Sequence, residues 1–356
     1  MNLTVGQARS VASNLLQAVG LDLENAEITA RAIVLADCWG VGSHGMLRLP
    51  YYLERTIAGG YPPRATMESV TDTGPVTVFD GGGGLGHWQL WKAATIASAR
   101  CAQHGIAAAA VGNSGHCGAL GVYTLPALQR GLVALVFSNG PAVMPPWGSS
   151  TPLLSTSPLA AGIPCEPRAA IVDMATSAVA RGKIASYAQR GEPLPPGWGL
   201  DAVGEPTQDA KLALMGMLSP LGGAKGYALA FLVECLSAGL VGPTLSADVS
   251  DMFATKDASR PQRIAHLVIT LDPSRLDVEG GTGAPRRLAD LASRLQAAGS
   301  RLPGSRRRMP DEIDDDELLN LDPSLEEDLR AWATRLDLVA MPSSTQLHGP
   351  RFHDNN

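Results

Sequence analysis

Near the N-terminus, apolar residues recur at helical spacing. Thr4 and Gln7 have the spacing of a capping box, in which each side chain accepts a hydrogen bond from a free backbone N–H at a helix start. Asp22 is a candidate N-cap for a second helix, which we expect to reach about Ala36. A segment rich in Leu, Arg and Tyr follows, and a double proline ends it. The pattern predicts a helical N-terminal region over residues 1–75.

The middle of the chain alternates between strand and helix patterns. Short apolar runs predict strands at residues 76–79, 105–111, 132–137, 171–174 and 265–271. Longer runs predict helices at residues 88–103 and 226–240, and the second should be buried because it is apolar throughout. This mixture predicts an α/β fold, with a central lobe over residues 76–272.

Two amphipathic patterns close the chain. They predict helices at residues 288–298 and 323–336, inside a C-terminal helical region over residues 273–340 that packs back on the N-terminal region. Residues 341–356 are polar, and we expect a flexible tail there. The chain has 356 residues, more than the roughly 250–300 at which single cores stop growing, so several lobes are expected.

Composition narrows the function classes. A net charge of -6 without a dominant basic stripe argues against a nucleic-acid partner. Five scattered cysteines without a CxxC pair argue against a disulfide framework or structural zinc, and the histidines show no metal-binding spacing. The N-terminus lacks a signal-peptide pattern. The most apolar segment, residues 226–242, is too short to span a membrane and contains Glu234. We therefore expect a cytoplasmic protein with neither a membrane span nor a metal site.

One glycine-rich segment resembles a nucleotide-binding loop. Residues 81–86 match the G-x-G-x-x-G pattern of a Rossmann fold, between a predicted strand and a predicted helix. That interpretation requires a carboxylate at the end of the next strand, but the chain has Asn113, Ser114, Gly115 and His116 there. Consecutive glycines also satisfy many patterns by chance, so a plain glycine loop is favoured.

A second segment carries residues suited to 2-oxo acid chemistry. If Ser43 to Arg48 is helical, His44 and Arg48 lie one turn apart on one face. A guanidinium can hold a carboxylate in a forked contact, and a neighbouring imidazole can exchange a proton with the C2 oxygen while hydride is transferred. Ser43 could orient that imidazole. The alternative is a helix-start serine with a surface histidine and arginine.

Two further loops are candidate sites. His116 lies among small residues in the segment 113–121, which would let a flat ligand approach; the alternative is a tight loop with a capping histidine. The segment 221–226 places glycines and Lys225 ahead of a helix, which would suit a phosphate. By itself it is better explained as a turn with a solvated lysine. The segment 112–116 misses the G-x-S-x-G pattern of serine hydrolases by one position.

Together these segments resemble the malate/L-lactate dehydrogenase family, which is unrelated to Rossmann dehydrogenases. The family includes ureidoglycolate and sulfolactate dehydrogenases, 2,3-diketogulonate reductase and Δ1-piperideine-2-carboxylate reductase. The resemblance covers roughly residues 2–335 and rests on these blocks, in order: Ser43-His44-Gly45 with Arg48 and Pro50; Asn113-Ser114 with His116 and Gly118; Pro141-Ala142 through Pro145 with Thr156 and Pro158; Asp173 to Ser177; Arg181-Gly182-Lys183; Arg190-Gly191-Glu192; Gly222-Gly223 with Lys225-Gly226; and Arg301 with Pro303-Gly304.

The resemblance implies a fold, an assembly and a chemistry. The fold would be a family-specific, non-Rossmann α/β fold in which a largely antiparallel sheet binds NAD or NADP. The active form would be a homodimer with the site near the subunit interface. The reaction would be hydride transfer between the nicotinamide and C2 of a small 2-hydroxy or 2-oxo acid. Two alternatives stay open, reduction of a cyclic 2-imino acid on the same fold and a non-catalytic ligand-binding homologue.

The resemblance also implies roles by matched position. His44 would be the proton donor with Ser43 beside it, Arg48 and Thr156 would contact substrate, and His116 would serve in acid/base chemistry or contact the cofactor. Which histidine moves the proton stays open. The other expected cofactor contacts are Cys117, Gly118, Ala119, Leu120, Ser157, Pro158, Asp173, Met174, Ala175, Lys225, Gly226, Arg301, Pro303 and Gly304.

The chain departs from the family pattern at several of these positions. Ser157 stands where the family often has Asn, Ala224 where it often has His, and Cys117 where it often has an aromatic residue. These changes affect expected substrate and cofactor contacts. Lys183 stands near the place of a carboxylate in the imine-reducing members, which favours a hydroxy or oxo acid substrate.

Overall fold

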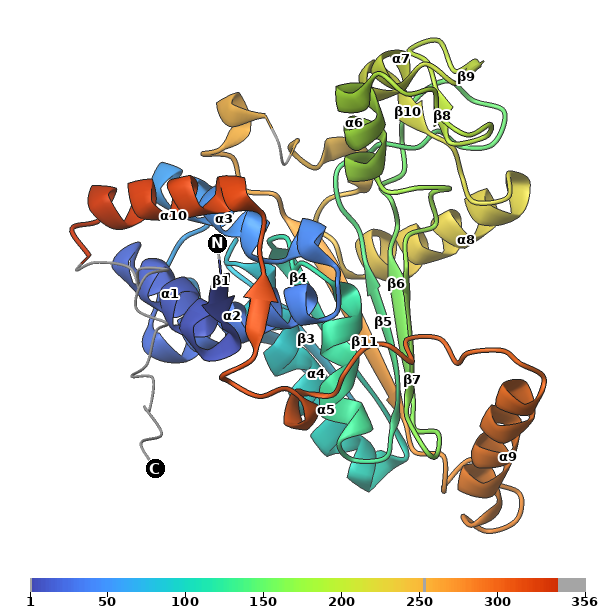
Figure 1. Cartoon of the computed structure of the whole chain (residues 1–356). Coiled ribbons are helices and arrows are strands. Elements are labelled where there is room, and N and C mark those ends of the chain that lie inside the picture. The colour runs from blue at the N-terminus through green and yellow to red at the C-terminus, as the bar shows by residue number, and fades with distance from the viewer. Residues whose placement is uncertain (1, 252–253, 339–356) are drawn as a thin grey trace, which may run out of the picture.

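The computed structural model describes residues 2–251 and 254–338, which surround one large sheet (Figure 1). Its seven strands lie in the order β2-β3-β4-β11-β5-β6-β7. Only the pair β3–β4 is parallel. The expected α/β fold with a largely antiparallel sheet is confirmed. The strands are β2 (Glu68–Asp72), β3 (Val76–Asp80), β4 (Ile106–Ser114), β5 (Val133–Ser138), β6 (Leu159–Ile163), β7 (Ala170–Met174) and β11 (Ile264–Leu271).

The glycine-rich loop is part of the sheet scaffold. It joins β3 to helix α4 (Gly86–His104), which returns to the parallel neighbour β4. The backbone N–H groups of Gly81 and Gly83 donate to the carbonyls of Gly112 and Asn113 at 2.9 and 2.7 Å. These two donors are therefore satisfied by the protein itself. Together with the antiparallel sheet, this confirms a plain glycine loop and excludes a Rossmann fold.

Helices cover both faces of the sheet, but unequally. Helix α4 contacts β4 and β11 on one face, beside the short helices η3 (Leu120–Thr124) and α5 (Leu125–Leu128). Helix α8 (Ala224–Glu234) and its π-helical continuation η4 (Cys235–Gly239) contact β5 and β11 on the other face (Figure 1). Leu229, Phe231 and Leu232 of α8 are nevertheless 41%, 56% and 49% exposed. The prediction of a buried helix is wrong for the single chain, because only one side of α8 meets the sheet.

The two ends of the described chain meet on one side of the sheet. Helices α1 (Val5–Ala18), α2 (Leu23–Cys38) and α3 (Leu49–Ala58) lie there beside α10 (Pro323–Arg335) (Figure 1). Strand β1 (Asn2–Thr4) pairs antiparallel with β12 (Leu318–Asn320). The predicted capping box of Thr4 and Gln7 is confirmed. The predicted N-cap of α2 is also confirmed, since the Asp22 carboxylate accepts the Asn25 N–H at 2.9 Å.

The remaining elements extend from this body. Helices α6 (Arg181–Arg190) and α7 (Ala210–Met215) form a small lobe with β8 (Gly199–Leu200), β9 (Pro206–Thr207) and β10 (Met217–Leu218), at the top of Figure 1. Helix α9 (Gly283–Ala297) stands away from the body at the opposite end and begins earlier than predicted. Single turns occur at η5 (Ser246–Asp248), η6 (Thr255–Asp257) and η7 (Pro310–Glu312).

Two expectations are not tested by this description. The division of the chain at residues 75/76 and 272/273 stays a prediction. The expected flexible tail, residues 341–356, lies outside the described residues. Among the helices that the structure describes, none is long and apolar enough to cross a membrane.

The capping box gives the first testable prediction. Replacing Thr4 by Ala removes the hydroxyl that accepts the Gln7 N–H at 3.2 Å, and should lower the free energy of unfolding by about 1 kcal/mol. Urea denaturation measures this. In the control Thr95→Ala, a hydroxyl that bonds the Trp91 carbonyl on an exposed face of α4 is lost. This control should lower the free energy of unfolding by at most about 0.5 kcal/mol. Equal losses in the two variants would contradict the prediction.

Candidate active site

The turn between α2 and α3 carries three of the expected site residues. It consists of two single turns of 3-10 helix, η1 (Gly42–His44) and η2 (Met46–Arg48), joined at Gly45. The conditional prediction of one helical turn through His44 and Arg48 is therefore wrong. Gly45 is extended (φ -91°, ψ -149°) and interrupts the helix. The Arg48 Nε donates to the Ser43 carbonyl at 2.8 Å, so the two short turns still form one compact unit.

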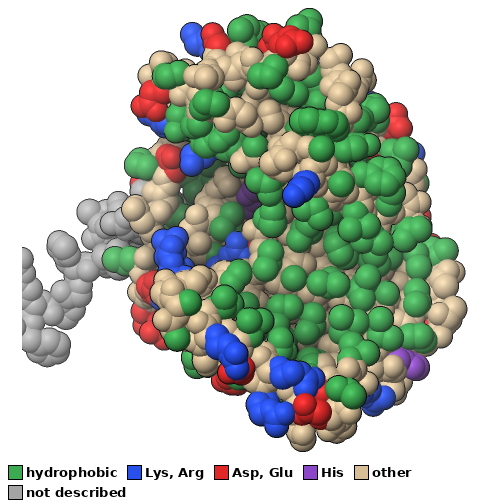
Figure 2. Space-filling view, turned by 90° about the vertical axis from the view of Figure 1, so that its right-hand side faces the viewer, with side chains coloured by type: hydrophobic (Ala, Val, Ile, Leu, Met, Phe, Trp, Pro, Cys, Tyr) green, Lys and Arg blue, Asp and Glu red, His purple; other side chains and the backbone are tan. Residues whose placement is uncertain are grey.

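His44 and His116 face one another across this unit. Their rings are stacked with centroids 5.9 Å apart and an interplanar angle of 27°. The Ser43 hydroxyl lies 2.9 Å from Nδ1 of His44, as the sequence suggested. Both histidines are half-buried. In Figure 2 a histidine lies inside a hollow with Lys and Arg side chains at its edge.

The proton of the neutral His116 ring can be assigned from its contacts. The N–H of Gly118 donates to Nδ1 of His116 at 3.3 Å, and the Tyr52 hydroxyl lies 2.8 Å from the same nitrogen. A backbone N–H can only donate, so Nδ1 is an acceptor and the proton resides on Nε2. The Tyr52 hydroxyl then also donates to Nδ1. His116 therefore presents an N–H group, through Nε2, at the side of the ring away from these contacts.

Burial keeps the site histidines uncharged. It lowers the pKa of His44 to about 4, with the nearby Arg48 cation as a second cause. Burial also lowers the pKa of His116 well below its usual value, and the neighbouring His44 adds to the effect. The pKa values of the buried His87 and His266 fall to about 3 and about 4 for the same main reason. In the unliganded protein these rings are neutral at pH 7.

The expected cofactor residues converge at one end of β6 and β7. Antiparallel pairing sets Asp173 and Met174 beside the start of β6. Thr156, Ser157 and Pro158 immediately precede that strand in the chain. The Thr156 carbonyl accepts the Thr176 N–H at 2.9 Å. The Thr176 carbonyl in turn accepts the Leu221 N–H at 2.8 Å, which ties the loop ahead of α8 to the same place. Lys225 and Gly226 follow in the first turn of α8, where Lys225 is exposed.

The other expected cofactor residues reach β7 and η3. The Pro303 carbonyl accepts the Ile171 N–H at 3.0 Å, which sets Arg301, Pro303 and Gly304 against β7. Cys117, Ala119 and Leu120 are buried at the start of η3, and Gly118 between them has φ +70°. Ala175 continues the chain after β7 and is half-buried. Among the described residues, no cluster of His, Cys, Asp or Glu could hold a metal ion.

The structure shows how serine is accommodated at position 157, where the family often has Asn. Its φ of +42° lies in the left-handed region, where Asn is several-fold enriched over other non-glycine residues. Ser157 is fully buried, and its N–H donates to the Ser155 hydroxyl at 2.9 Å. A local serine-serine bond therefore holds the conformation at this position.

Sequence reasoning missed four residues that shape the site. Tyr52 bonds the His116 ring, and the Gln262 side-chain oxygen accepts the backbone N–H of His116 at 3.1 Å. The His87 ring lies 4.8 Å from that of Tyr52, and both its nitrogens are buried without a hydrogen-bond partner in the part of the chain that the structure describes. Asp37 contacts the turn that carries His44. Tyr52 follows Arg48 at i+4 on α3, so its direction could have been inferred. Gln262 and His87 act across the fold and have no local signal, and the contact of Asp37 with Met46 depends on the shape of the turn between them.

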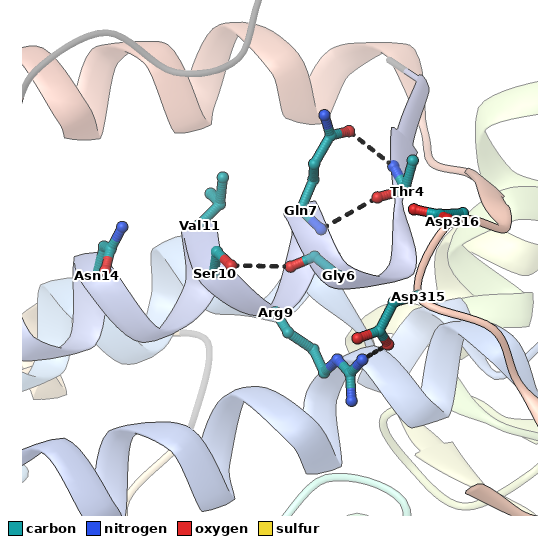
Figure 3. A pocket seen from close by; sticks show the side chains of 9 residues that line it. All are labelled: Thr4, Gly6, Gln7, Arg9, Ser10, Val11, Asn14, Asp315 and Asp316. Carbon is teal, nitrogen blue, oxygen red and sulfur yellow. Dashed lines mark hydrogen bonds and ion pairs between the residues drawn. The ribbon is translucent and has the colours of Figure 1, made fainter. Parts of the chain in front are cut away.

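A separate hollow of about 730 Å³ lies between the start of α1 and the segment ahead of β12 (Figure 3). Arg9 and Asp315 form an ion pair at its edge. It shares no lining residue with the histidine site and has no histidine. We therefore do not assign the chemistry to it.

The neutral histidines predict a loss of stability in acid. An unfolded ring takes up a proton below about pH 6.5, whereas the folded His44, His87 and His266 do so only near pH 4, 3 and 4. In that window the unfolded state binds more protons. The free energy of unfolding should therefore decrease as the pH is lowered, by roughly 1.4 kcal/mol per pH unit for each ring. Burial raises the pKa of Asp37 to about 6, which offsets one ring between about pH 4 and 6.

Urea denaturation at about pH 7.5 and about pH 5 measures this loss. His87→Phe removes one ring that resists protonation in the fold, and it should make the pH dependence shallower. The control His104→Phe changes an exposed histidine at the end of α4 and should leave the pH dependence as it is. Equal stability of the natural chain at the two pH values would contradict the prediction.

Comparisons with known proteins agree with this geometry. Residues 3–325 match the family model described as malate/L-lactate dehydrogenase. A (2R)-3-sulfolactate dehydrogenase (NADP(+)) from Chromohalobacter salexigens is 35% identical over 335 residues, which cover 93% of this chain and 98% of the relative. A Δ1-pyrroline-2-carboxylate/Δ1-piperideine-2-carboxylate reductase from Pseudomonas putida is 36% identical over 312 residues, 85% and 90% of the two chains.

Solved structures give the same result. The sulfolactate dehydrogenase from Methanocaldococcus jannaschii superposes with a TM-score of 0.86 at 28% identity, over 95% of this chain and 98% of the other. The Δ1-piperideine-2-carboxylate reductase from Pseudomonas syringae superposes with a TM-score of 0.83 at 29% identity, over 94% and 100% of the two chains. By sequence and by fold, the chain belongs to the malate/L-lactate dehydrogenase family.

Proposed function

We propose that this protein is an NAD(P)-dependent oxidoreductase that transfers a hydride between the nicotinamide and C2 of a small 2-hydroxy or 2-oxo acid. The observation that carries the proposal is the facing pair of neutral rings, His44 and His116, with Arg48 in the same turn. Relatives whose names specify sulfolactate or malate dehydrogenases support it. The NADP(+) in the name of one relative supports a nicotinamide cofactor.

Arg48 is proposed to hold the substrate carboxylate. Its Nε bond to the Ser43 carbonyl fixes the plane of the guanidinium, and a planar guanidinium is suited to a carboxylate. Arg48 also contributes to the lowered pKa of His44. A carboxylate on Arg48 would cancel part of that positive field and raise the pKa of His44. Substrate binding would thus bring His44 closer to the protonated form that an acid catalyst needs.

The two histidines divide the proton chemistry. In the direction of reduction, a proton passes from an imidazole nitrogen to the C2 oxygen as hydride reaches C2; oxidation reverses both transfers. His44 is the proposed donor, oriented by the Ser43 hydroxyl at 2.9 Å. His116, with its proton on Nε2, can donate a hydrogen bond to the same oxygen or to the cofactor, and Thr156 is proposed to contact the substrate.

The residues present fit a dinucleotide. Gly222 has φ +62° and open space where a side chain would stand, so its backbone could approach a phosphate closely. Lys225 follows in the first turn of α8. Small residues at 117–119 and the joined segments 156–158 and 173–175 would line the rest of the cofactor's path, with residues 301–304 beside β7. When bound, the nicotinamide supplies or accepts the hydride.

A cyclic 2-imino acid is the second candidate substrate. It is favoured by the pyrroline and piperideine carboxylate reductases among the relatives. Against it stands Lys183, whose ammonium lies 5.2 Å from the ring centre of Trp198, near where the imine-reducing members carry a carboxylate.

All five cysteines are free thiols, which suits the proposed cytoplasmic location.

A homodimer is proposed as the active form. The exposed residues of α8 lie beside an incompletely covered sheet face, where Ile106 is also 50% exposed. Figure 2 shows hydrophobic side chains gathered over a broad face below the hollow. Helix α9 projects from the body with Leu291 and Leu295 exposed at 53% and 38%. An exposed face with so many hydrophobic side chains is typical of a subunit interface.

Cofactor binding and turnover test the proposed reaction. Titration with NADH and NADPH separately should give saturable binding of at least one, followed by turnover of a 2-oxo acid. His44→Ala should lower kcat by about 100-fold or more while cofactor binding survives. His104→Ala changes an exposed histidine far along α4 and should leave kcat and cofactor binding unchanged. Turnover of cyclic imines alone would favour the second candidate, and binding of neither nucleotide would revive a non-catalytic role.

The dimer is tested by its mass in solution. Sedimentation should give a dimer for the natural chain and a monomer-enriched distribution for the double variant Leu291→Arg, Leu295→Arg on α9, because buried charges oppose association. The control Arg294→Gln changes the same helix, where Arg294 is ion-paired with Asp290 at the surface, and should stay dimeric. A monomeric natural chain would refute the proposal.

A further inference from the structure

A carboxylate of α2 holds the middle of the turn that carries His44 and Arg48. Asp37, in the last turn of α2, accepts the backbone N–H of Met46 on its Oδ2 at 2.7 Å. Met46 begins the second 3-10 turn and is fully buried. The bond therefore joins α2 to the middle of the segment, with His44 two residues before Met46 and Arg48 two residues after it.

The same carboxylate also occupies the space beside Gly45. A Cβ atom built on Gly45 would lie 2.0 to 2.4 Å from three atoms of the Asp37 carboxyl group, closer than any real contact. Gly45 thus allows the backbone to approach the carboxylate, and the carboxylate fills the volume that a larger residue would need. Asp37 and Gly45 fit one another as a pair.

The anchor itself is rigid. Ile33, Val34 and Ala36 on the preceding turn of α2 are buried at 0%, 1% and 0% exposure. A side chain carried by a packed helix holds its partner more precisely than one carried by a loop. Ser43, by contrast, is exposed, and its bonds to His44 and Arg48 lie within the turn and cannot place that turn in the molecule.

We propose that Asp37 is a positioning residue, which sets the places of His44 and Arg48 relative to each other and to His116 by holding the Gly45–Met46 backbone against the end of α2. The role rests on the proposed function of His44 and Arg48. Asp37 does not touch the reacting atoms; it acts through the turn. Displacement of catalytic groups by about 1 Å can cost about 100-fold in rate.

Kinetics of Asp37 variants give the first test. Asp37→Ala should lower kcat by about 10- to 100-fold while the Kd for NADPH or NADH stays within about twofold of the natural value. Asp37→Asn keeps an oxygen that can accept the Met46 N–H and should restore most of kcat. The control Asp22→Ala removes the N-cap at the other end of α2, and should lower the melting temperature without changing kcat. Natural kcat in Asp37→Ala would overturn the proposal.

A double-mutant comparison separates positioning from general destabilisation. Gly45→Ala in the natural chain forces a methyl group into the carboxylate and should reduce kcat strongly. In the Asp37→Ala background that space is empty, so Gly45→Ala should cost little further kcat. Fully additive losses would mean that the two residues act independently, and would overturn the pairing.

A spectroscopic readout keeps this proposal distinct from the proposed function. Histidine-selective ¹⁵N labelling, with His44 assigned through His44→Ala, reports the ring environment whether or not any substrate is turned over. Asp37→Asn and Asp37→Ala should leave the His104 signals in place, and Asp37→Ala should shift those of His44. Unmoved His44 signals would overturn the role of Asp37, even in an active enzyme. Shifted signals in a chain without turnover would uphold it and refute only the proposed reaction.

Discussion

The position of β11 between β4 and β5 is the constraint on which the site depends. This strand comes from late in the chain and is antiparallel to both neighbours. Its His266 donates from Nε2 to the Gly115 carbonyl at 3.1 Å and accepts from the Ser138 hydroxyl at 2.9 Å through Nδ1. The side-chain oxygen of Gln262, just ahead of the strand, accepts the backbone N–H of His116. One inserted segment thus fixes the loop that carries His116, while α2 and α3 bring His44 from the other side.

The low polarity around the site histidines determines their protonation state. A buried imidazole resists protonation, and His87 is one such case, with a pKa lowered to about 3 and two nitrogens that have no hydrogen-bond partner among the described residues. Neutral rings can each donate one hydrogen bond and accept another. The same environment strengthens the effect of any charge that enters. An anionic substrate would therefore change the protonation balance of the site more than it would in water.

Local patterns in the sequence predicted much of the fold but not the way its parts meet. The capping box at Thr4, the N-cap at Asp22 and the strands β3, β4, β5, β7 and β11 follow from periodicity and turn chemistry, and the structure has them; β2 and β6 of the same sheet were not predicted. The two-residue strands of the small lobe are too short to produce a period. The bond from Met46 to the Asp37 carboxylate joins two separate helical elements, and the bond from His116 to Gln262 joins residues 146 positions apart. Such contacts exist only once the tertiary fold has formed.

The pairing of β1 with β12 has a consequence for how the chain is made. The first free N–H groups of α1, at Val5 and Gly6, donate to the carbonyls of Glu317 and Asp315 at 2.8 and 2.9 Å. A nascent chain leaves the ribosome from its N-terminus and at a limited rate. The first turn of α1 therefore keeps these bonds unmade until residues 315–317 have been synthesised. Helix α1 packs against α2 and α3, which flank the His44 turn, so the surroundings of this turn are completed by a segment that is made long after the turn itself.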